Sequence, residues 1–371
     1  MTLIITHTMR PVNKGTAADN GYAYNSNSII DFSNTKYAAA SLALLTTDKP
    51  TAARCSYFLL SIINIPQKNL TADQELLKKG VNDRFKGMYQ SAAIPLFNRL
   101  GAYCSFCENI ITTYIEVEHC VPKSPYPDFT VIWDNFLTAC GPCNQLKGDK
   151  PSRQVVRIWL QQEGNNNPTE QDYYDCIRKR HYVWADLDAL SYMELPADLW
   201  YFSLSNNTWV LVPAPGNTDV NNTIVSTNVG QREIYANINL LGTMVIRKVE
   251  VKIRSNTNPS PHGQELIDLC QLNRLGELTN TSDRRLFSRT QAYFNALQVL
   301  RTFLIAVGNQ QIFDLLWPSY LTLAKINGFY SVFLRLLDNY YDPSGTPLNQ
   351  RFVTETNNAL YFPNTNTLAL P

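Results

Sequence analysis

Four of the eight cysteines form two pairs with two residues between the members, Cys104 with Cys107 and Cys140 with Cys143. Four thiolates at this spacing can complete a closed tetrahedral zinc site with Zn–S bonds of about 2.3 Å and no open position for catalysis. Ordinary buried thiols are the alternative. Two pairs that bracket one histidine favour the metal, so the sequence predicts a structural Zn²⁺ that clamps two segments of the chain.

That histidine, His119, directly follows Glu118. An imidazole is largely unprotonated near neutral pH, so His119 can act as a general base. Alternatively, His119 is a core histidine whose ring nitrogens are hydrogen-bonded, or a further metal ligand. Glu118 and Asn144 offer a carboxylate and an amide oxygen, which suit a single Mg²⁺ or Mn²⁺ ion. Glu116 lies on the same strand face as Glu118 and is a candidate for a supporting carboxylate.

The elements that must position these groups follow from the pattern between the cysteine pairs. A strand-like run over 112–121 precedes a proline-containing loop, a second apolar run over 130–133 and a helix that begins at the second pair. This order predicts a β-hairpin followed by a helix. His119 at the end of the first strand would then face Asn144 in the first helical turn.

The regions around this segment differ in pattern. Residues 1–35 are predicted to form an extended N-terminal arm, because they are rich in Asn, Gly, Ala and Ser without periodicity. Residues 36–102 show helical spacing, beginning near Tyr37, and Thr71 opens the longest stretch, which Pro95 should kink or end.

The remaining chain is predicted to be mixed and then helical. Residues 103–150 form the chemical module. Residues 151–371 show strand patterns followed by helices, one of them interrupted by Pro318; one strand pair is expected over 199–213, around the turn at 205–208, and another within 232–253. The fold class is therefore predicted as α+β, with a zinc-stapled ββα-metal module between a helical N-terminal region and a mixed C-terminal region.

Composition limits the classes of function. With Lys+Arg 32 against Asp+Glu 31, the formal net charge is only +1, so any site for a polyanion must be local. No run approaches the roughly 18 apolar residues that a membrane span needs, and the N-terminus lacks the features of a signal peptide. We expect a cytoplasmic protein, where paired cysteines bind metals more often than they form disulfides.

The motif resembles the HNH, or His-Me finger, endonucleases, in which His119, Asn135 and Asn144 stand at the three named positions. The resemblance implies that His119 activates a water for attack on a phosphodiester, most readily in DNA rather than RNA. It also implies that Glu118 and Asn144 hold the cation and that Asn135 tethers the loop that orients the histidine. Lysines that could contact flanking phosphates are Lys123, Lys147 and Lys150; solvated lysines explain each of them equally well.

A narrower resemblance covers more of the chain. The segments MRPVNKG, LGAYCSFCE, EVEHCVPKS, WDNFLTACGPCNQLKGDK and ELIDLCQLNRLGEL, followed by Arg285 and Arg289, look like the HNH nuclease subunits of Septu-type and retron-linked anti-phage systems. This resemblance implies an antiviral defence role beside an ABC- or SMC-type ATPase. The alternative is a non-catalytic, zinc-ribbon-like scaffold that binds nucleic acid or a partner, although such a scaffold has no need of Glu118, His119 and Asn144 at one point.

Overall fold

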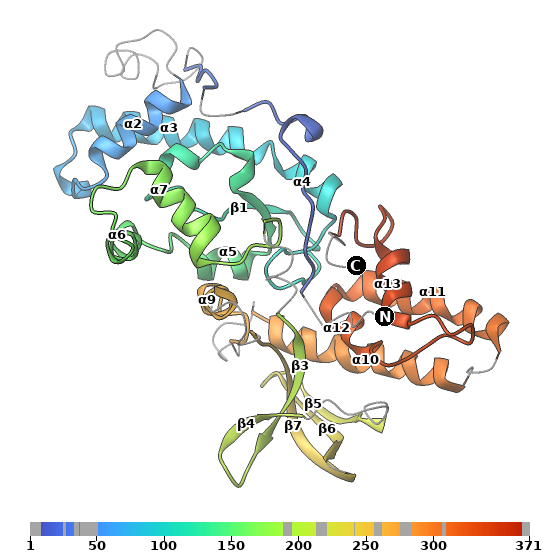
Figure 1. Ribbon diagram of the computed structural model, residues 1–371. Helices are drawn as coiled ribbons and strands as arrows, with labels where there is room; N and C mark the ends of the chain where they lie inside the picture. Colours follow the sequence, from blue (N-terminus) through green and yellow to red (C-terminus); the bar gives the residue numbers. More distant parts are fainter. Residues whose placement is uncertain are drawn as a thin grey trace.

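The chain combines α-helices with two antiparallel sheets, which confirms the predicted mixed α+β class. Figure 1 shows two bodies, one of helices around a small hairpin and one of a larger sheet beside the C-terminal helices. No helix in the described part of the chain is long and apolar enough to cross a bilayer. The computed structural model describes residues 9–24, 27–32, 37, 51–187, 195–212, 221–240, 242–255, 262–274, 283–305 and 309–365.

Three helices precede the first cysteine pair: α2 (Ala52–Ile62), α3 (Ala72–Gln90) and α4 (Ala93–Leu100). Thr71 starts α3 as predicted, through a capping box in which its side chain and that of Gln74 each bond the other's backbone N–H. Pro95 does not end α3. It lies in the first turn of α4, where a missing N–H breaks no helical hydrogen bond. The helical spacing predicted after Tyr37 lies outside the described residues.

The small hairpin joins β1 (Glu116–His119) to β2 (Phe136–Ala139). The strands are antiparallel, with His119 opposite Phe136, and α5 (Gly141–Lys147) follows in the predicted order. The second strand was expected over 130–133, and this was wrong. Those residues link two 3-10 turns, and their apolar side chains fill the core, a pattern that sequence periodicity does not separate from a strand.

The C-terminal sheet has five antiparallel strands in the order β4-β3-β7-β6-β5. The two hairpins predicted from the sequence, β3 with β4 and β6 with β7, are confirmed. The strands are β3 (Ala197–Ser203), β4 (Thr208–Leu211), β5 (Thr223–Asn228), β6 (Glu233–Leu240) and β7 (Thr243–Ile253).

The other helices are α6 (Arg153–Gln162), α7 (Glu170–Asp175), a π-helical turn (Cys176–His181), α9 (His262–Leu269), α10 (Arg285–Ile305), α11 (Gln310–Asn327), α12 (Tyr330–Leu336) and α13 (Leu348–Thr356). Of these helices, α10 and α12 contact the sheet, α11 packs on α10, and α13 packs on α12 (Figure 1). The 3-10 turns are Ala18–Asn20, Gln67–Asn69, Pro127–Phe129 and Trp133–Asn135.

Pro318 does not interrupt α11, contrary to the expectation from sequence. The helix runs through it from Gln310 to Asn327. A proline inside a helix removes one hydrogen bond and crowds the preceding turn. Buried aromatic residues on both sides of it, Trp317 and Tyr320, hold the helix against its neighbours and offset that cost.

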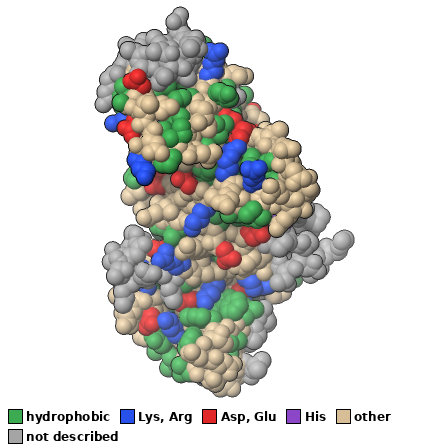
Figure 2. All heavy atoms as spheres, turned by 90° about the vertical axis from the view of Figure 1, so that its left-hand side faces the viewer, with side chains coloured by type: hydrophobic (Ala, Val, Ile, Leu, Met, Phe, Trp, Pro, Cys, Tyr) green, Lys and Arg blue, Asp and Glu red, His purple; other side chains and the backbone are tan. Residues whose placement is uncertain are grey.

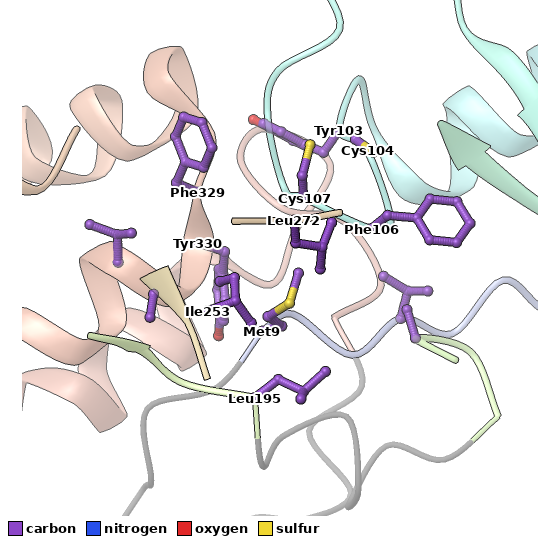
Figure 3. Close-up of a cluster of buried hydrophobic side chains, with 14 of the residues drawn as sticks. Met9, Tyr103, Cys104, Phe106, Cys107, Leu195, Ile253, Leu272, Phe329 and Tyr330 are labelled. Carbon is purple, nitrogen blue, oxygen red and sulfur yellow. The ribbon is translucent and has the colours of Figure 1, made fainter. Parts of the chain in front are cut away.

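One hydrophobic core joins the N-terminal arm, the cysteine module and the C-terminal region. Figure 3 shows part of it, with Met9 from the arm, Cys107 from the module, and Leu272 and Phe329 from the C-terminal region. The arm lies along the module, and Val12 N–H donates to the carbonyl of Ala185 at 2.7 Å. The metal site described below therefore lies against a shared core.

Candidate functional site

The four paired cysteines converge at one buried point. Cys104 and Cys107 come from a turn before β1, and Cys140 and Cys143 from the start of α5. Their Sγ atoms all lie within 4.8 Å of one another, and those of Cys107 and Cys140 are 3.6 Å apart. A tetrahedral site with Zn–S bonds of about 2.3 Å has sulfur–sulfur edges of about 3.8 Å, whereas a disulfide is about 2.05 Å long. The four residues therefore fit a single Zn²⁺.

Backbone hydrogen bonds shape both halves of this cluster. The Cys104 carbonyl accepts from the N–H of Glu108 at 2.9 Å, and the Cys104 N–H donates to Asn109 at 3.0 Å, which closes the first turn. Ser105 N–H donates to the Thr138 carbonyl in β2 at 2.9 Å and ties this turn to the hairpin. The remaining cysteines are also buried and lie outside this cluster: Cys55, Cys120, Cys176 and Cys270.

His119 ends β1 with its ring buried and its tautomer defined. Its Nε2 lies 2.8 Å from the Thr130 carbonyl oxygen, which can only accept, so Nε2 carries the proton and Nδ1 keeps a lone pair. Burial lowers the pKa of His119 to about 3, so the imidazole is neutral at physiological pH. Tyr89 and Phe136 pack edge-on against the ring, with centroids 4.8 and 5.2 Å away. The neutral ring therefore keeps its lone pair at one defined atom, Nδ1.

Asn135 ends the 3-10 turn directly before β2 and is fully buried. Its Oδ1 accepts from Val121 N–H at 2.7 Å, and its Nδ2 donates to the carbonyls of Val121 and Phe129 at 2.8 and 3.0 Å. These bonds hold the segment that follows His119 against the loop that carries Thr130. Asn135 thus positions the histidine without lining the cleft around it.

Replacing Asn135 with alanine is expected to lower the free energy of unfolding by about 3 kcal/mol, because buried backbone groups of Val121 and Phe129 lose their partners. Urea denaturation followed by tryptophan fluorescence measures this loss. Asn144→Ala is the matched control, since Asn144 is only partly buried and should cost much less. Equal losses in both variants would contradict the assigned role.

Four side chains of β1 and α5 form two pairs between these elements. Asn144 Nδ2 donates to Glu116 Oε2 at 2.5 Å, and Lys147 Nζ lies 2.8 Å from Glu118 Oε1. Burial raises the pKa of the Glu118 carboxyl, and the Lys147 ammonium opposes that shift. Asn144 therefore bonds directly to Glu116, whereas the sequence analysis grouped it with Glu118.

One cleft of about 930 Å³ brings most of the predicted site together. The predicted residues that line it are Glu116, Glu118, His119, Lys123 and Asn144. Tyr89 of α3 also lines it, contacts His119, and accepts from Lys123 Nζ at 2.9 Å. No sequence motif marks Tyr89, because it precedes the module and only the tertiary fold brings it there.

The three lysines predicted to contact phosphate lie in different environments. Lys123 is exposed at the cleft, and Lys150 is exposed but does not line it. Lys147 is fully buried on Glu118, so it does not present its ammonium to a ligand in this structure. Figure 2 shows one face of the molecule on which basic and acidic side chains are interspersed, in keeping with the net charge of +1.

Replacing Lys147 with methionine is expected to lower the free energy of unfolding by about 3–5 kcal/mol, because Glu118 would then be a buried charge without its partner. Thermal and urea unfolding measure the loss. The double variant Lys147→Met with Glu118→Gln should recover most of it, since the uncompensated charge is removed. A double variant as unstable as Lys147→Met alone would show that the pair is not what stabilises this position.

Comparisons with known proteins give one similarity. No family model and no solved structure matches the chain. Over 95 residues the chain is 33% identical to the Septu protein PtuB of Bacillus thuringiensis, a stretch that covers 24% of this chain and 37% of that protein. The similarity thus spans little more than a third of the relative's length. It supports a relationship between this chain and Septu anti-phage defence.

Proposed function

We propose that this chain is a metal-dependent endonuclease of the HNH type that hydrolyses phosphodiester bonds. The observation that carries the proposal is the cleft in which the neutral imidazole of His119, fixed by Thr130, lies with the oxygen ligands of Glu118 and Asn144. A structural protein has no need to place a base with a defined free nitrogen beside hard metal ligands. A hydrolase needs both.

Each residue then has a distinct task. His119 Nδ1 takes the proton of the attacking water, while Thr130 and Tyr89 keep the ring in position. Glu118 and Asn144, with Glu116 beside them, would hold Mg²⁺ or Mn²⁺. When bound, that ion supplies Lewis-acid stabilisation of charge on the phosphate oxygens.

The remaining residues support this arrangement. Asn135 holds the backbone on both sides of the histidine. Lys123, exposed at the cleft, is placed to contact a neighbouring phosphate, and Lys150 could do so further along the strand. The cysteine cluster would hold structural Zn²⁺ and fix the start of α5, and with it Asn144, relative to the knuckle before β1.

The direct test is cleavage by the purified chain of supercoiled plasmid, single-stranded DNA and RNA, each with Mg²⁺, Mn²⁺ or EDTA. Metal-dependent nicking of plasmid, with RNA cut more slowly, is the expected result. Cleavage that persists in EDTA would contradict the proposed role of the cation. Preference for RNA would reassign the substrate and leave the chemistry in place.

We further propose that the chain is an effector of antiviral defence in the cytoplasm and acts with an ABC- or SMC-type ATPase. The similarity to a Septu protein supports the defence role. The net charge of +1 gives little long-range attraction to nucleic acid, so a partner that recruits the nuclease would complement it. Co-expression with a candidate ATPase should raise cleavage in the presence of ATP. Cleavage unaffected by ATPase and ATP would remove the partner from the proposal.

A non-catalytic zinc-ribbon-like scaffold is the second candidate. Two observations favour it: Glu118 is already paired with Lys147, and His119 is only 5% exposed. If the chain is a scaffold, replacing His119 should leave its affinity for DNA or a partner unchanged. The wild-type chain should then cut no nucleic acid, whether metal, ATP or a partner is supplied.

A further inference from the structure

Two arginines of α10 lie buried, and one of them, Arg285, contacts the four-cysteine cluster. Arg285 is 2% exposed and Arg289 is 0% exposed. Arg285 Nη1 donates to Cys143 Sγ at 3.1 Å, across 142 residues of sequence. Arg285 and Cys143 are far apart in the sequence, and only the fold brings them together.

Arg285 has a carboxylate partner beside its sulfur contact, whereas the hydrogen bonds of Arg289 go to neutral acceptors. Arg285 is held by both carboxylate oxygens of Asp283, at 2.9 and 3.0 Å. Arg289 bonds only neutral acceptors, the carbonyls of Val251 and Leu272 and the Asn273 side chain, at 3.3–3.4 Å. No carboxylate in the described part of the chain forms an ion pair with Arg289.

Electrostatics makes the thiolates the natural counter-charge. Four thiolates around one divalent cation leave two negative charges, and a buried charge is costly unless an opposite charge lies near it. Burial lowers the pKa of the Arg289 guanidinium, and the negative charges of Cys107, Glu108 and Cys143 oppose this shift, Cys107 most strongly. A metal–thiolate centre and a fully buried guanidinium therefore stabilise one another.

We propose that Arg285 and Arg289 are the counter-ions of the zinc–thiolate centre, and that this centre anchors the C-terminal region to the cysteine module. Arg289 donates to the carbonyl of Val251 in β7 and to that of Leu272 in the turn after α9, so it connects α10 to both. Leu272 lies in the same buried cluster as Cys107 (Figure 3). The proposal rests on zinc binding and is independent of nuclease activity.

Zinc affinity of the purified full chain, measured by competition with a chromogenic chelator, tests the counter-ion role. Arg285→Met and Arg289→Met are each expected to weaken zinc binding by about 10–100-fold, the usual effect of removing a partner that supports a metal ligand. Arg289→Lys, which keeps the charge, should recover most of the affinity. Arg335→Met is the control, because Arg335 is also a buried arginine, in α12, and its guanidinium pairs with Asp198. It should leave zinc affinity unchanged.

Wild-type affinity in the two methionine variants would overturn the proposal, and so would equal weakening in Arg335→Met, which would indicate general destabilisation. Hydrogen exchange of the wild-type chain covers the case in which the variants do not fold. Removal of zinc by a chelator should increase exchange in α9 and α10 as well as in the module. Unchanged protection of α10 in the zinc-free chain would refute the anchoring role.

Discussion

Replacing His119 with alanine is expected to reduce metal-dependent plasmid cleavage by roughly 10²–10⁴-fold, the usual contribution of a general base. The reduction should appear in the turnover rate, because the imidazole does not hold the cation. His119 lines the cleft, and the hydrogen bond from its Nε2 to the Thr130 carbonyl leaves Nδ1 unprotonated. Nicking of supercoiled DNA, quantified on agarose gels under single-turnover conditions, measures the effect.

The control for this prediction is His262→Ala. His262 is a half-buried histidine at the start of α9, outside the cleft, so its removal should leave cleavage unchanged. Circular dichroism and zinc content establish that both variants remain folded. Equal cleavage by wild type and His119→Ala would refute the assignment of the base while leaving the zinc-binding predictions untouched.

Replacing Cys104 with serine is expected to release about one zinc ion per chain and to unfold the cysteine module. Structural zinc sites of this kind contribute apparent binding free energies on the order of 10 kcal/mol, far more than a small polar segment gains from its own core. Because Cys104 also lies in the core shared with the C-terminal region, the melting temperature of the whole chain should fall. Mass spectrometry of metal content and differential scanning calorimetry measure both effects.

Cys55→Ser provides a matched comparison. Cys55 is equally buried but lies alone in α2, in a separate hydrophobic cluster. The Cys55→Ser chain should keep its zinc and lose only the small stability that a buried thiol contributes. A Cys104→Ser chain that retains both zinc and its melting temperature would show that the cluster does not staple the fold.

The sequence by itself determined the parts whose signals are local. Two cysteine pairs with two intervening residues predicted a cluster, and the structure places all four Sγ atoms within 4.8 Å. The capping residue Thr71 and the two C-terminal hairpins were also predicted, because a helix cap and a period-two pattern act over a few residues. The strand expected over 130–133 failed for the same reason, since a short apolar run fits a buried turn as well as a strand.

Only the tertiary structure decided which side chains pair within the cleft and what surrounds the cysteines. Lys147 looked like a surface cation but is buried on Glu118, and Tyr89 reaches His119 from a helix that precedes the module. Arg285 meets Cys143 from a distant helix. These contacts depend on how separate elements pack, and the spacing of residues along the chain does not predict that packing. The sequence therefore identifies the residue types that could do the chemistry. The charge state and the partners of each side chain depend on burial in the folded chain.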